Sequence, residues 1–231
     1  MNLFIGYDSA EPVAYHTLAH SILTRSSVPV TITPLVRRHL GVAGYTRARG
    51  PLESTEFSLT RFLVPHLSNY KGRSVFMDCD MLCRVDIATL MLDIISQADK
   101  AVVVCQHDYQ PTSTTKFLNQ PQTAYYRKNW SSFMVFNNAK CTTLTPEYVN
   151  TATGLQLHRF EWLRDQDAIG SLPLDWNWLV GEYSRNDDAK MLHFTTGGPW
   201  FPDCEDVDYA EEWRLERAAM LTAARVVKVS A

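Results

Sequence analysis

The sequence predicts an α/β fold with a mostly parallel central sheet flanked by helices. Short apolar runs alternate with stretches of helical spacing along the first half of the chain, which is the pattern of β-α-β units. One run, Ala101–Cys105, is continuously apolar, as in strands buried on both faces of a parallel sheet. A chain of 231 residues, 45% of them hydrophobic, can bury one large core. We therefore expect a single domain over residues 1–231.

The N-terminal segment is expected to open a β-α-β unit. A buried strand at Leu3–Ile5 ends in the polar turn Gly6–Asp8, and a helix with regularly spaced apolar residues starts at Pro12. A second strand is predicted over 28–35. The basic, glycine-containing stretch 37–51 is too irregular for a regular element, so we expect a loop there.

The next elements lead to the first polar cluster. Ser54 or Thr55 can cap a helix that runs to Leu63, and a strand follows at Ser74–Met77. Residues 86–96 have helical spacing and precede the apolar strand 101–105. This order continues the alternation of strands and helices.

The second half of the chain is less regular. The polar stretch 106–129 is expected to be a long loop near a ligand, and 132–137 to be another strand. A helix is predicted by composition over Tyr209–Val227. We divide the domain into a nucleotide-binding half at about 1–105, an acceptor and catalytic half at about 106–205, and a C-terminal helix in 206–231.

Two aspartates one residue apart, Asp78 and Asp80, directly follow an apolar run. Because side chains alternate along a strand, both carboxylates point to the same side. Oxygen ligands suit hard divalent cations such as Mg²⁺ and Mn²⁺, with which proteins bind diphosphates. Ligands of parallel sheets bind beyond the carboxyl ends of strands, where both this pair and the turn Gly6–Asp8 are expected. The ordinary alternative is that these aspartates are turn residues.

Charge and cysteine content narrow the classes of partner and compartment. With 22 basic and 25 acidic residues, the net charge of −3 offers no general attraction for nucleic acid. The five cysteines form no C-x-x-C pair, and their odd number argues against a disulfide framework. No apolar run reaches membrane-spanning length, and the first residues read as a strand rather than a secretory signal. We expect a cytoplasmic protein without a nucleic-acid partner or transmembrane segment, for which peripheral membrane contact stays open.

Five segments carry motifs in a recognisable order. Ser54–Phe62 places an arginine ahead of the strand that ends in Asp78–Asp80. Further on, Arg164–Ile169 contains Asp-Gln-Asp, Leu172–Asn177 reads Leu-Pro-x-x-Trp-Asn, and His193–Trp200 ends in Pro-Trp. Together they resemble the motifs of family 8 of the glycosyltransferases, which includes glycogenin-like and bacterial galactosyltransferase-like enzymes. The resemblance implies a divergent member with the GT-A fold, a Rossmann-like nucleotide half merged with an acceptor half.

The resemblance implies metal-dependent transfer of a hexose from a UDP-sugar to a glycan, lipid-linked or small-molecule acceptor, with retention of the anomeric configuration. The implied metal ligands are Asp78, Asp80 and His193, with Mn²⁺ as the expected ion and Mg²⁺ as the alternative. The implied catalytic residues are Gln166, near the anomeric carbon, and Asp165, on the donor-sugar hydroxyls. The residues implied in donor and nucleotide binding are Gly6, Tyr7, Asp8, Arg61, Asp78, Cys79, Gly197 and Gly198.

The last motif departs from the family pattern. Gly197-Gly198 stands before Pro199 where the family has a lysine that touches the diphosphate. Backbone N–H groups of the two glycines can serve instead, because glycine lets the chain approach a phosphate closely. The Asn-Ala-Gly that the family places before its next strand is also absent near Ser131–Phe133, which leaves the donor sugar undetermined.

Three alternatives stay open. A sugar-phosphate nucleotidyltransferase would also use the carboxylate pair, although such enzymes usually open with a basic, glycine-rich loop and Gly6–Glu11 is acidic. A non-catalytic protein of the same fold would bind a nucleotide sugar or glycan without turnover. Within the leading hypothesis, Asp167, Asp175 or Glu182 could serve as the general base of an inverting mechanism.

Overall fold

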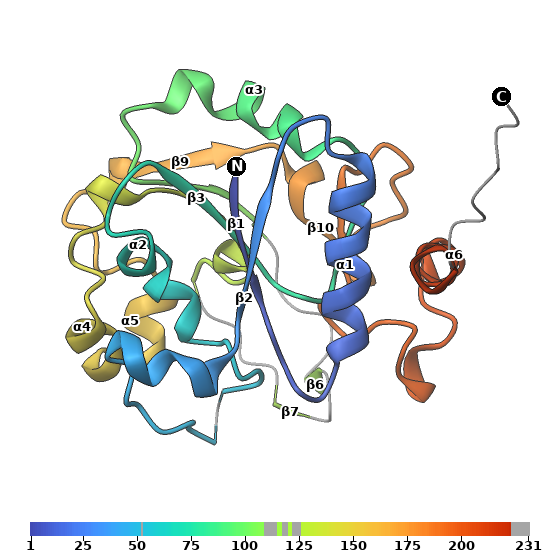
Figure 1. The fold of residues 1–231 in the computed structure, drawn as a ribbon, viewed down its shortest axis with the longest axis horizontal. Coiled ribbons are helices and arrows are strands. Elements are labelled where there is room, and N and C mark those ends of the chain that lie inside the picture. The colour runs from blue at the N-terminus through green and yellow to red at the C-terminus, as the bar shows by residue number, and fades with distance from the viewer. Residues whose placement is uncertain (52, 109–114, 117–119, 122–125, 223–231) are drawn as a thin grey trace, which may run out of the picture.

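The computed structural model describes residues 1–51, 53–108, 115–116, 120–121 and 126–222 (Figure 1). Its centre is a six-stranded sheet. In spatial order the strands are β2 (Thr31–Leu35), β1 (Asn2–Gly6), β3 (Arg73–Met77), β8 (Phe133–Asn137), β5 (Val102–Cys105) and β9 (Ile169–Leu172). Three of the pairings are parallel, β1 with β2, β1 with β3 and β5 with β9, and only β8 runs antiparallel to its neighbours. The predicted α/β class with a mostly parallel sheet is confirmed.

Helices lie on both sides of this sheet. They are α1 (Pro12–Arg25), α2 (Val64–Leu67), α3 (Leu90–Ile94), α4 (Pro146–Thr151), α5 (Gly154–His158) and α6 (Ala210–Leu221). Figure 1 shows α1 and α6 on one side and α2, α4 and α5 grouped on the other. Pro12 begins α1, where its missing N–H costs nothing. Thr153 and Gln156 form a capping box that starts α5.

A second, three-stranded sheet brings distant segments together. It consists of β10 (Trp178–Leu179), β11 (Met191–His193) and β4 (Met81–Cys83). β11 pairs antiparallel with β4, so that His193 lies opposite Met81. Phe194 N also donates to Asp80 O at 2.8 Å. Because Asp80 immediately precedes β4, this register holds His193 beside it. The two-residue strands β6 (Thr115–Lys116) and β7 (Gln120–Pro121) form a separate antiparallel pair.

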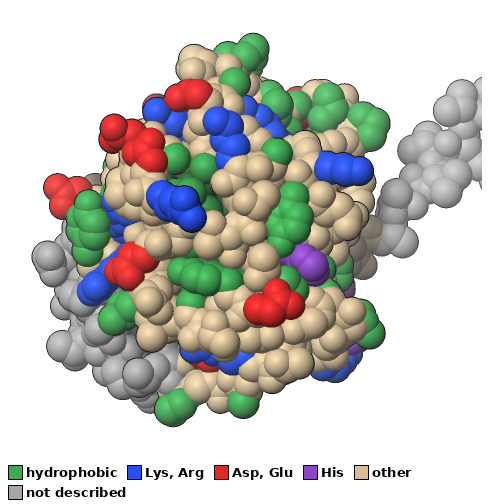
Figure 2. All heavy atoms as spheres, turned by 90° about the vertical axis from the view of Figure 1, so that its left-hand side faces the viewer, with side chains coloured by type: hydrophobic (Ala, Val, Ile, Leu, Met, Phe, Trp, Pro, Cys, Tyr) green, Lys and Arg blue, Asp and Glu red, His purple; other side chains and the backbone are tan. Residues whose placement is uncertain are grey.

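Two apolar clusters form the interior. The larger one packs against the main sheet and includes the fully buried strand β5, as its continuous apolar sequence predicts. The smaller cluster surrounds the second sheet and includes Leu82, Leu192, Phe194 and Trp213. On the face shown in Figure 2, basic and acidic side chains are interspersed, in keeping with the nearly balanced composition.

Several elements differ from the sequence prediction. β2 starts at Thr31, three residues later than predicted, and Val28 is exposed at the surface. The stretch 37–51, predicted as a loop, contains a 3₁₀ helix at Arg37–Ala43. The helix predicted over 86–96 is divided into the 3₁₀ turn Ile87–Thr89, α3, and the 3₁₀ turn Ile95–Gln97.

The helix predicted from Ser54 to Leu63 is also wrong as a regular helix. The chain instead forms turns, a 3₁₀ helix at Thr60–Leu63 and then α2. Pro65 lies in the first turn of α2, where its missing N–H is tolerated. The predicted loop 106–129 and helix 209–227 are described only in part, and residues 223–227 of the latter lie outside the described range.

Candidate functional site

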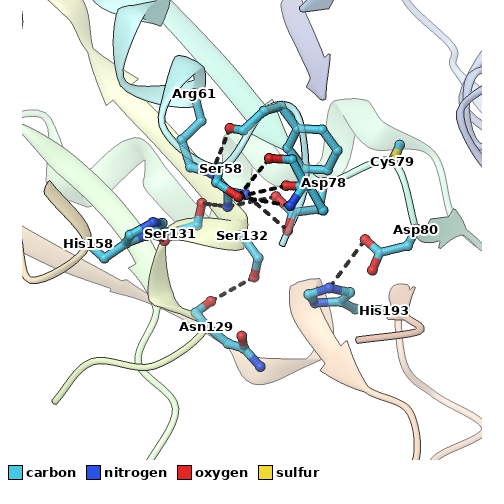
Figure 3. A network of polar contacts seen from close by, with 12 residues as sticks. Ser58, Arg61, Asp78, Cys79, Asp80, Asn129, Ser131, Ser132, His158 and His193 are labelled. Carbon is cyan, nitrogen blue, oxygen red and sulfur yellow. Dashed lines mark hydrogen bonds and ion pairs between the residues drawn. The ribbon is translucent and has the colours of Figure 1, made fainter. Parts of the chain in front are cut away.

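A cleft of about 540 Å³ lies at the carboxyl end of β3, and its walls include Arg61, Asp78, Asp80, Ser132 and His193 (Figure 3). Because β8 runs antiparallel to β3, the residues before β8 meet the residues after β3 at this edge. Asp78 N accordingly donates to Ser132 O at 2.9 Å. The volume falls within the range of small-molecule sites, roughly 300–1,000 Å³.

Asp78, Asp80 and His193 form a group suited to a divalent cation. Potential ligand atoms of the three all lie within 4.8 Å of one another, and His193 Nε2 is 3.4 Å from Asp80 Oδ1 (Figure 3). Within the described part of the chain, the buried Oδ1 atoms of both aspartates have charged neighbours, Arg61 Nη1 at 2.8 Å and His193 Nε2 at 3.4 Å, but neither contact has the geometry of a hydrogen bond. Two carboxylates and one imidazole are a donor set that suits Mn²⁺. The residues present therefore fit the metal that the sequence motif implies.

Asp78 and His193 of this group both have raised pKa values, each for its own reason. Burial raises the pKa of Asp78 to about 6, with Asp80 adding to the rise and Arg61 opposing it. For His193, burial disfavours the charged ring, but the charges of Asp80 and Asp78 outweigh it and raise the pKa above its usual value. A bound cation would offset the same carboxylate charge.

Arg61 forms an ion pair with Asp78 of this group. The residue is only 5% exposed, and its Nη1 lies 2.8 Å from Asp78 Oδ1 and donates to Ser131 O at 2.9 Å. The guanidinium also lies over the rings of Phe57 and Phe76, 5.3 and 4.9 Å from their centres. This packing fixes a permanent positive charge in the wall of the cleft.

The turn after β1 lies outside the described lining of the cleft. Asp8 is 2% exposed, and its carboxylate accepts from the backbone N–H groups of Ala10 and Glu56 at 2.9 and 3.0 Å. The ring of Tyr7 packs edge-on against Tyr15. A Cβ on Gly6 would come within 2.4 Å of the Phe57 ring. In this structure all three residues have structural contacts, and their predicted role with the nucleotide stays a prediction.

Cys79 points away from the two aspartates that flank it (Figure 3). Its buried thiol donates to Glu11 Oε1 at 3.4 Å, and burial raises the pKa of the thiol well above its usual value. Cys79 lies in the short bend between β3 and β4, and its side chain enters the core there. Any contact of Cys79 with a donor would therefore come from its backbone.

Gly197 and Gly198, in the motif His193–Trp200, occupy positions where the structure leaves no room for a side chain. Gly197 has φ +121° and lines the cleft, while a Cβ on Gly198 would lie 2.0 Å from the Trp200 ring. The N–H of Gly197 donates to Phe194 O at 2.8 Å. That N–H is thus already bound within a turn, which leaves the predicted phosphate contact without this donor.

The predicted catalytic pair, Asp165 and Gln166, is exposed and also outside the described lining of the cleft. Asp165 Oδ1 accepts from Asp167 N at 2.9 Å and starts the 3₁₀ helix Gln166–Ala168. Gln166 Oε1 accepts from Arg127 Nη1 at 2.5 Å. The structure therefore does not bring this pair together with the metal-binding group.

Sequence reasoning missed most of the lining, including Glu11, Lys128, Ser131 and His158. Glu11 is 4% exposed, and burial, then Asp80, raise the pKa of its carboxyl well above the usual value. Ser131 Oγ lies 2.7 Å from His158 Nδ1. A lone glutamate or lysine carries no local signal of function, and the Ser–His contact spans 27 positions, so the sequence offered no means of finding them.

No family model matches the chain. Over 223 residues it is 49% identical to Protein CDI of Arabidopsis thaliana, an alignment that covers 93% of this chain and 85% of that protein. The chain belongs to the family of Protein CDI. Identity at this level over almost the whole chain implies that the two family members share their fold.

Solved structures with a similar fold are glycosyltransferases. The bifunctional enzyme WbbM superposes with a TM-score of 0.65 at 16% identity, covering 94% of this chain and 49% of its own. GlyE of Streptococcus pneumoniae gives 0.62 at 14% identity, covering 96% of this chain and 60% of its own. An active-site mutant of LgtC gives 0.60 at 10% identity, covering 96% and 97%. The chain thus spans about half of WbbM and nearly all of LgtC, and it has the GT-A fold.

The helices that the structure describes are all too short or too polar to span a lipid bilayer.

Proposed function

We propose that this protein is a metal-dependent glycosyltransferase, a divergent relative of family 8, that transfers a hexose from a UDP-sugar to a carbohydrate, lipid-linked or small-molecule acceptor with retention of configuration. The observation that carries the proposal is the convergence of Asp78, Asp80 and His193 in one cleft of a GT-A fold. LgtC, which shares this fold, is named a galactosyltransferase and has been solved with donor and acceptor sugar analogues. This likeness supports a nucleotide-sugar donor.

The side chains of the cleft divide the work of donor binding. Asp78, Asp80 and His193 would hold Mn²⁺, or Mg²⁺ in its place, and the ion when bound offsets the charge of the donor diphosphate and of the leaving group. Arg61 holds Asp78 in place and adds a second positive charge to the same wall. One GT-A domain over residues 1–231, with its nucleotide half at about 1–105, would contain the whole donor site.

Lys128 supplies the cation that the last motif lacks. It lines the cleft and is 7% exposed, and a cation in such a partly desolvated wall would attract a phosphate strongly. We expect Lys128→Met to raise the KM for the donor about 10- to 100-fold, because this factor corresponds to the free energy of one lost charge-assisted hydrogen bond. The affinity for Mn²⁺ should stay unchanged. Lys140→Met is the matched control, because Lys140 Nζ donates to Asp99 O on the surface. An unchanged KM in Lys128→Met would contradict this role.

Asp165 and Gln166 are the proposed reacting residues. The carboxamide of Gln166 would have to leave Arg127 to reach an anomeric carbon in the cleft. Proton NMR of the anomeric centre of the product tests retention, and a product of inverted configuration would favour one of the alternative general bases.

The placement of Asp165 and Gln166 outside the described lining favours one second candidate, a non-catalytic nucleotide-sugar-binding protein. Such a protein would bind UDP with Mn²⁺ but show no turnover over a broad panel of acceptors. For either candidate we propose a cytoplasmic location. The five cysteines are all free thiols, and thiols stay reduced in the cytosol.

The test of the proposed function combines binding with turnover. The protein is incubated with Mn²⁺ and a panel of nucleotide sugars, and transfer and hydrolysis are measured. We expect Asp80→Ala to lower turnover by about 100-fold or more, since a catalytic metal contributes several kcal/mol to the transition state. Asp99→Ala, which removes a surface carboxylate paired with Lys100, is the control. Turnover that survives both chelation and Asp80→Ala would rule the proposal out.

A further inference from the structure

The buried side chain of Asn177 connects His193 to the opposite wall of the cleft. Asn177 is fully buried at the end of the 3₁₀ helix Leu174–Asn177. Its Oδ1 is 2.8 Å from His193 Nδ1, and its Nδ2 is 2.8 Å from Ser132 Oγ and 2.9 Å from His107 Nε2. One carboxamide therefore contacts three polar side chains at once.

Its neighbours determine which way the Asn177 carboxamide faces. Ser132 Oγ donates its hydrogen to Asn129 O at 2.7 Å, so toward Asn177 it can only accept (Figure 3 shows the Ser132–Asn129 bond). Asn129 O, 3.3 Å from Asn177 Nδ2, is likewise only an acceptor. The NH₂ group must therefore face Ser132, and the oxygen Oδ1 must face His193.

His107 agrees with this orientation. Burial lowers its pKa to about 3, so the ring is neutral, and its Nδ1 lies 2.9 Å from Tyr183 Oη. The ring can then donate from Nδ1 to Tyr183 and accept at Nε2 from Asn177 Nδ2. A flipped carboxamide would instead present its oxygen to Ser132 Oγ, which has no hydrogen left to donate.

The geometry points to Asn177 as a positioning residue that holds His193 in the Nδ1–H tautomer, so that its Nε2 lone pair faces Asp80 and the metal; its bearing on the metal rests on the proposed function. An acceptor such as Oδ1 can be bonded only by a protonated Nδ1. The partner of the non-ligating nitrogen sets the tautomer and angle of a metal-binding histidine. Asn177 thus orients the ligand without touching the ion or a substrate.

The first test needs no metal and reads the tautomer in the wild-type protein. NMR of the metal-free wild-type protein with ¹⁵N-labelled histidine is recorded in alkaline buffer, where the His193 ring is neutral. The two tautomers give distinct ring nitrogen signals, and His193→Ala identifies the His193 signal among the seven histidines. We expect the Nδ1–H form. A predominant Nε2–H form would overturn the inference.

The second test measures the affinity for Mn²⁺ by electron paramagnetic resonance. We expect Asn177→Leu to weaken Mn²⁺ binding about 10- to 100-fold, the usual effect of removing such a partner, and to remove the tautomer preference. Asn177→Asp keeps an acceptor toward His193 Nδ1 and should retain the Nδ1–H form. Asn138→Leu is the matched control, because Asn138 is equally buried but bonds Lys71 O and Ser74 Oγ instead.

The outcomes separate this inference from the proposed function. Unchanged Mn²⁺ affinity in a folded Asn177→Leu protein would overturn the inference, while loss of binding in Asp80→Ala would still support the proposed function. A wild-type protein that binds no Mn²⁺ would overturn the proposed function, and the tautomer measurement would still decide what Asn177 does.

Discussion

The charged carboxylate of Asp78, which the proposed metal site needs, lowers the stability of the folded state. Its carboxyl is 13% exposed, and burial beside Asp80 raises its pKa to about 6 despite the contact with Arg61. A raised pKa means that the folded state prefers the neutral acid. The stabilising effect of this group is therefore complete below the usual pKa of aspartate and is lost as the pH rises to about 6.

Replacing the Asp78 carboxyl by a neutral amide should show directly how much stability the charged carboxylate costs the folded protein. We expect Asp78→Asn in the metal-free protein to raise the free energy of unfolding at neutral pH by about 3 kcal/mol, because the pKa rises from 3.8 to about 6 and each pKa unit corresponds to roughly 1.4 kcal/mol. The same variant should lose Mn²⁺ binding. Urea denaturation at neutral and at acid pH measures the first effect, and the gain should disappear at acid pH. Equal stability of both proteins at neutral pH would contradict the predicted cost.

Asp93 provides a control of opposite sign. Burial opposes its ionisation, but hydrogen bonds from Trp176 Nε1 and Lys190 Nζ outweigh it and lower the pKa of its carboxyl. The stability from this group is present above the usual pKa of aspartate and lost as the pH falls. Asp93→Asn should therefore destabilise the protein at neutral pH, where Asp78→Asn stabilises it.

At the scale of elements, β1 can pack closely against the segment that contains Phe57, because Gly6 has no side chain. Gly6 ends β1, and the Phe57 ring occupies the place where its Cβ would be. The Phe57 ring in turn packs against the Arg61 guanidinium, and the backbone oxygen of Phe57 accepts from Arg61 Nε at 3.4 Å. The absence of a side chain at Gly6 is thus coupled to the position of Arg61.

We expect Gly6→Ala to lower the free energy of unfolding by about 1–3 kcal/mol, the usual cost of overpacking a core. Displacement of Phe57 should also shift Arg61 and weaken binding of UDP. Calorimetry measures both the free energy of unfolding and the affinity for UDP. Gly41→Ala is the control, because a Cβ there meets nothing within 4 Å, and its effect should stay within about 0.5 kcal/mol. Wild-type UDP affinity in Gly6→Ala would show that the two elements are not coupled in this way.

At the scale of the whole molecule, helix α6 supports the metal-binding group from outside the main sheet. Trp213 of α6 is buried in the smaller apolar cluster, together with Leu82 of β4 and Leu192 of β11. These two strands hold Asp80 and His193 beside each other. Glu216 ties the same helix to Arg25 of α1 at 2.7 Å.

Trp213→Ala should therefore affect both stability and metal binding. We expect a loss of about 3–5 kcal/mol in the free energy of unfolding, as for other buried aromatic residues, together with weaker binding of Mn²⁺. Trp162→Ala is the matched control, since Trp162 is equally buried but lies in the larger cluster. It should lose similar stability and keep its Mn²⁺ affinity under conditions where both variants are folded. Equal Mn²⁺ affinity in the two variants would contradict the support by α6.

Local patterns predicted the framework of this fold. The apolar run before Asp78 predicted β3, and the continuous run Ala101–Cys105 predicted a strand buried on both faces. The helix predicted through Leu63 was wrong, because the chain there forms turns and the 3₁₀ helix Thr60–Leu63 before α2 begins. The role of β8 was also not predictable, since the direction of a strand in a sheet depends on partners far away in the chain.

The sequence by itself determined that Asp78 and Asp80 directly follow a buried strand, because a short apolar run that ends in polar residues indicates where such a strand ends. Only the tertiary structure decided which side chains join them. The register of β4 with β11 brings His193 to Asp80, and the order of strands brings Lys128 to the same cleft while Gln166 stays outside its described lining. The physical reason is range: periodicity acts over a few residues, whereas these contacts join segments tens of residues apart.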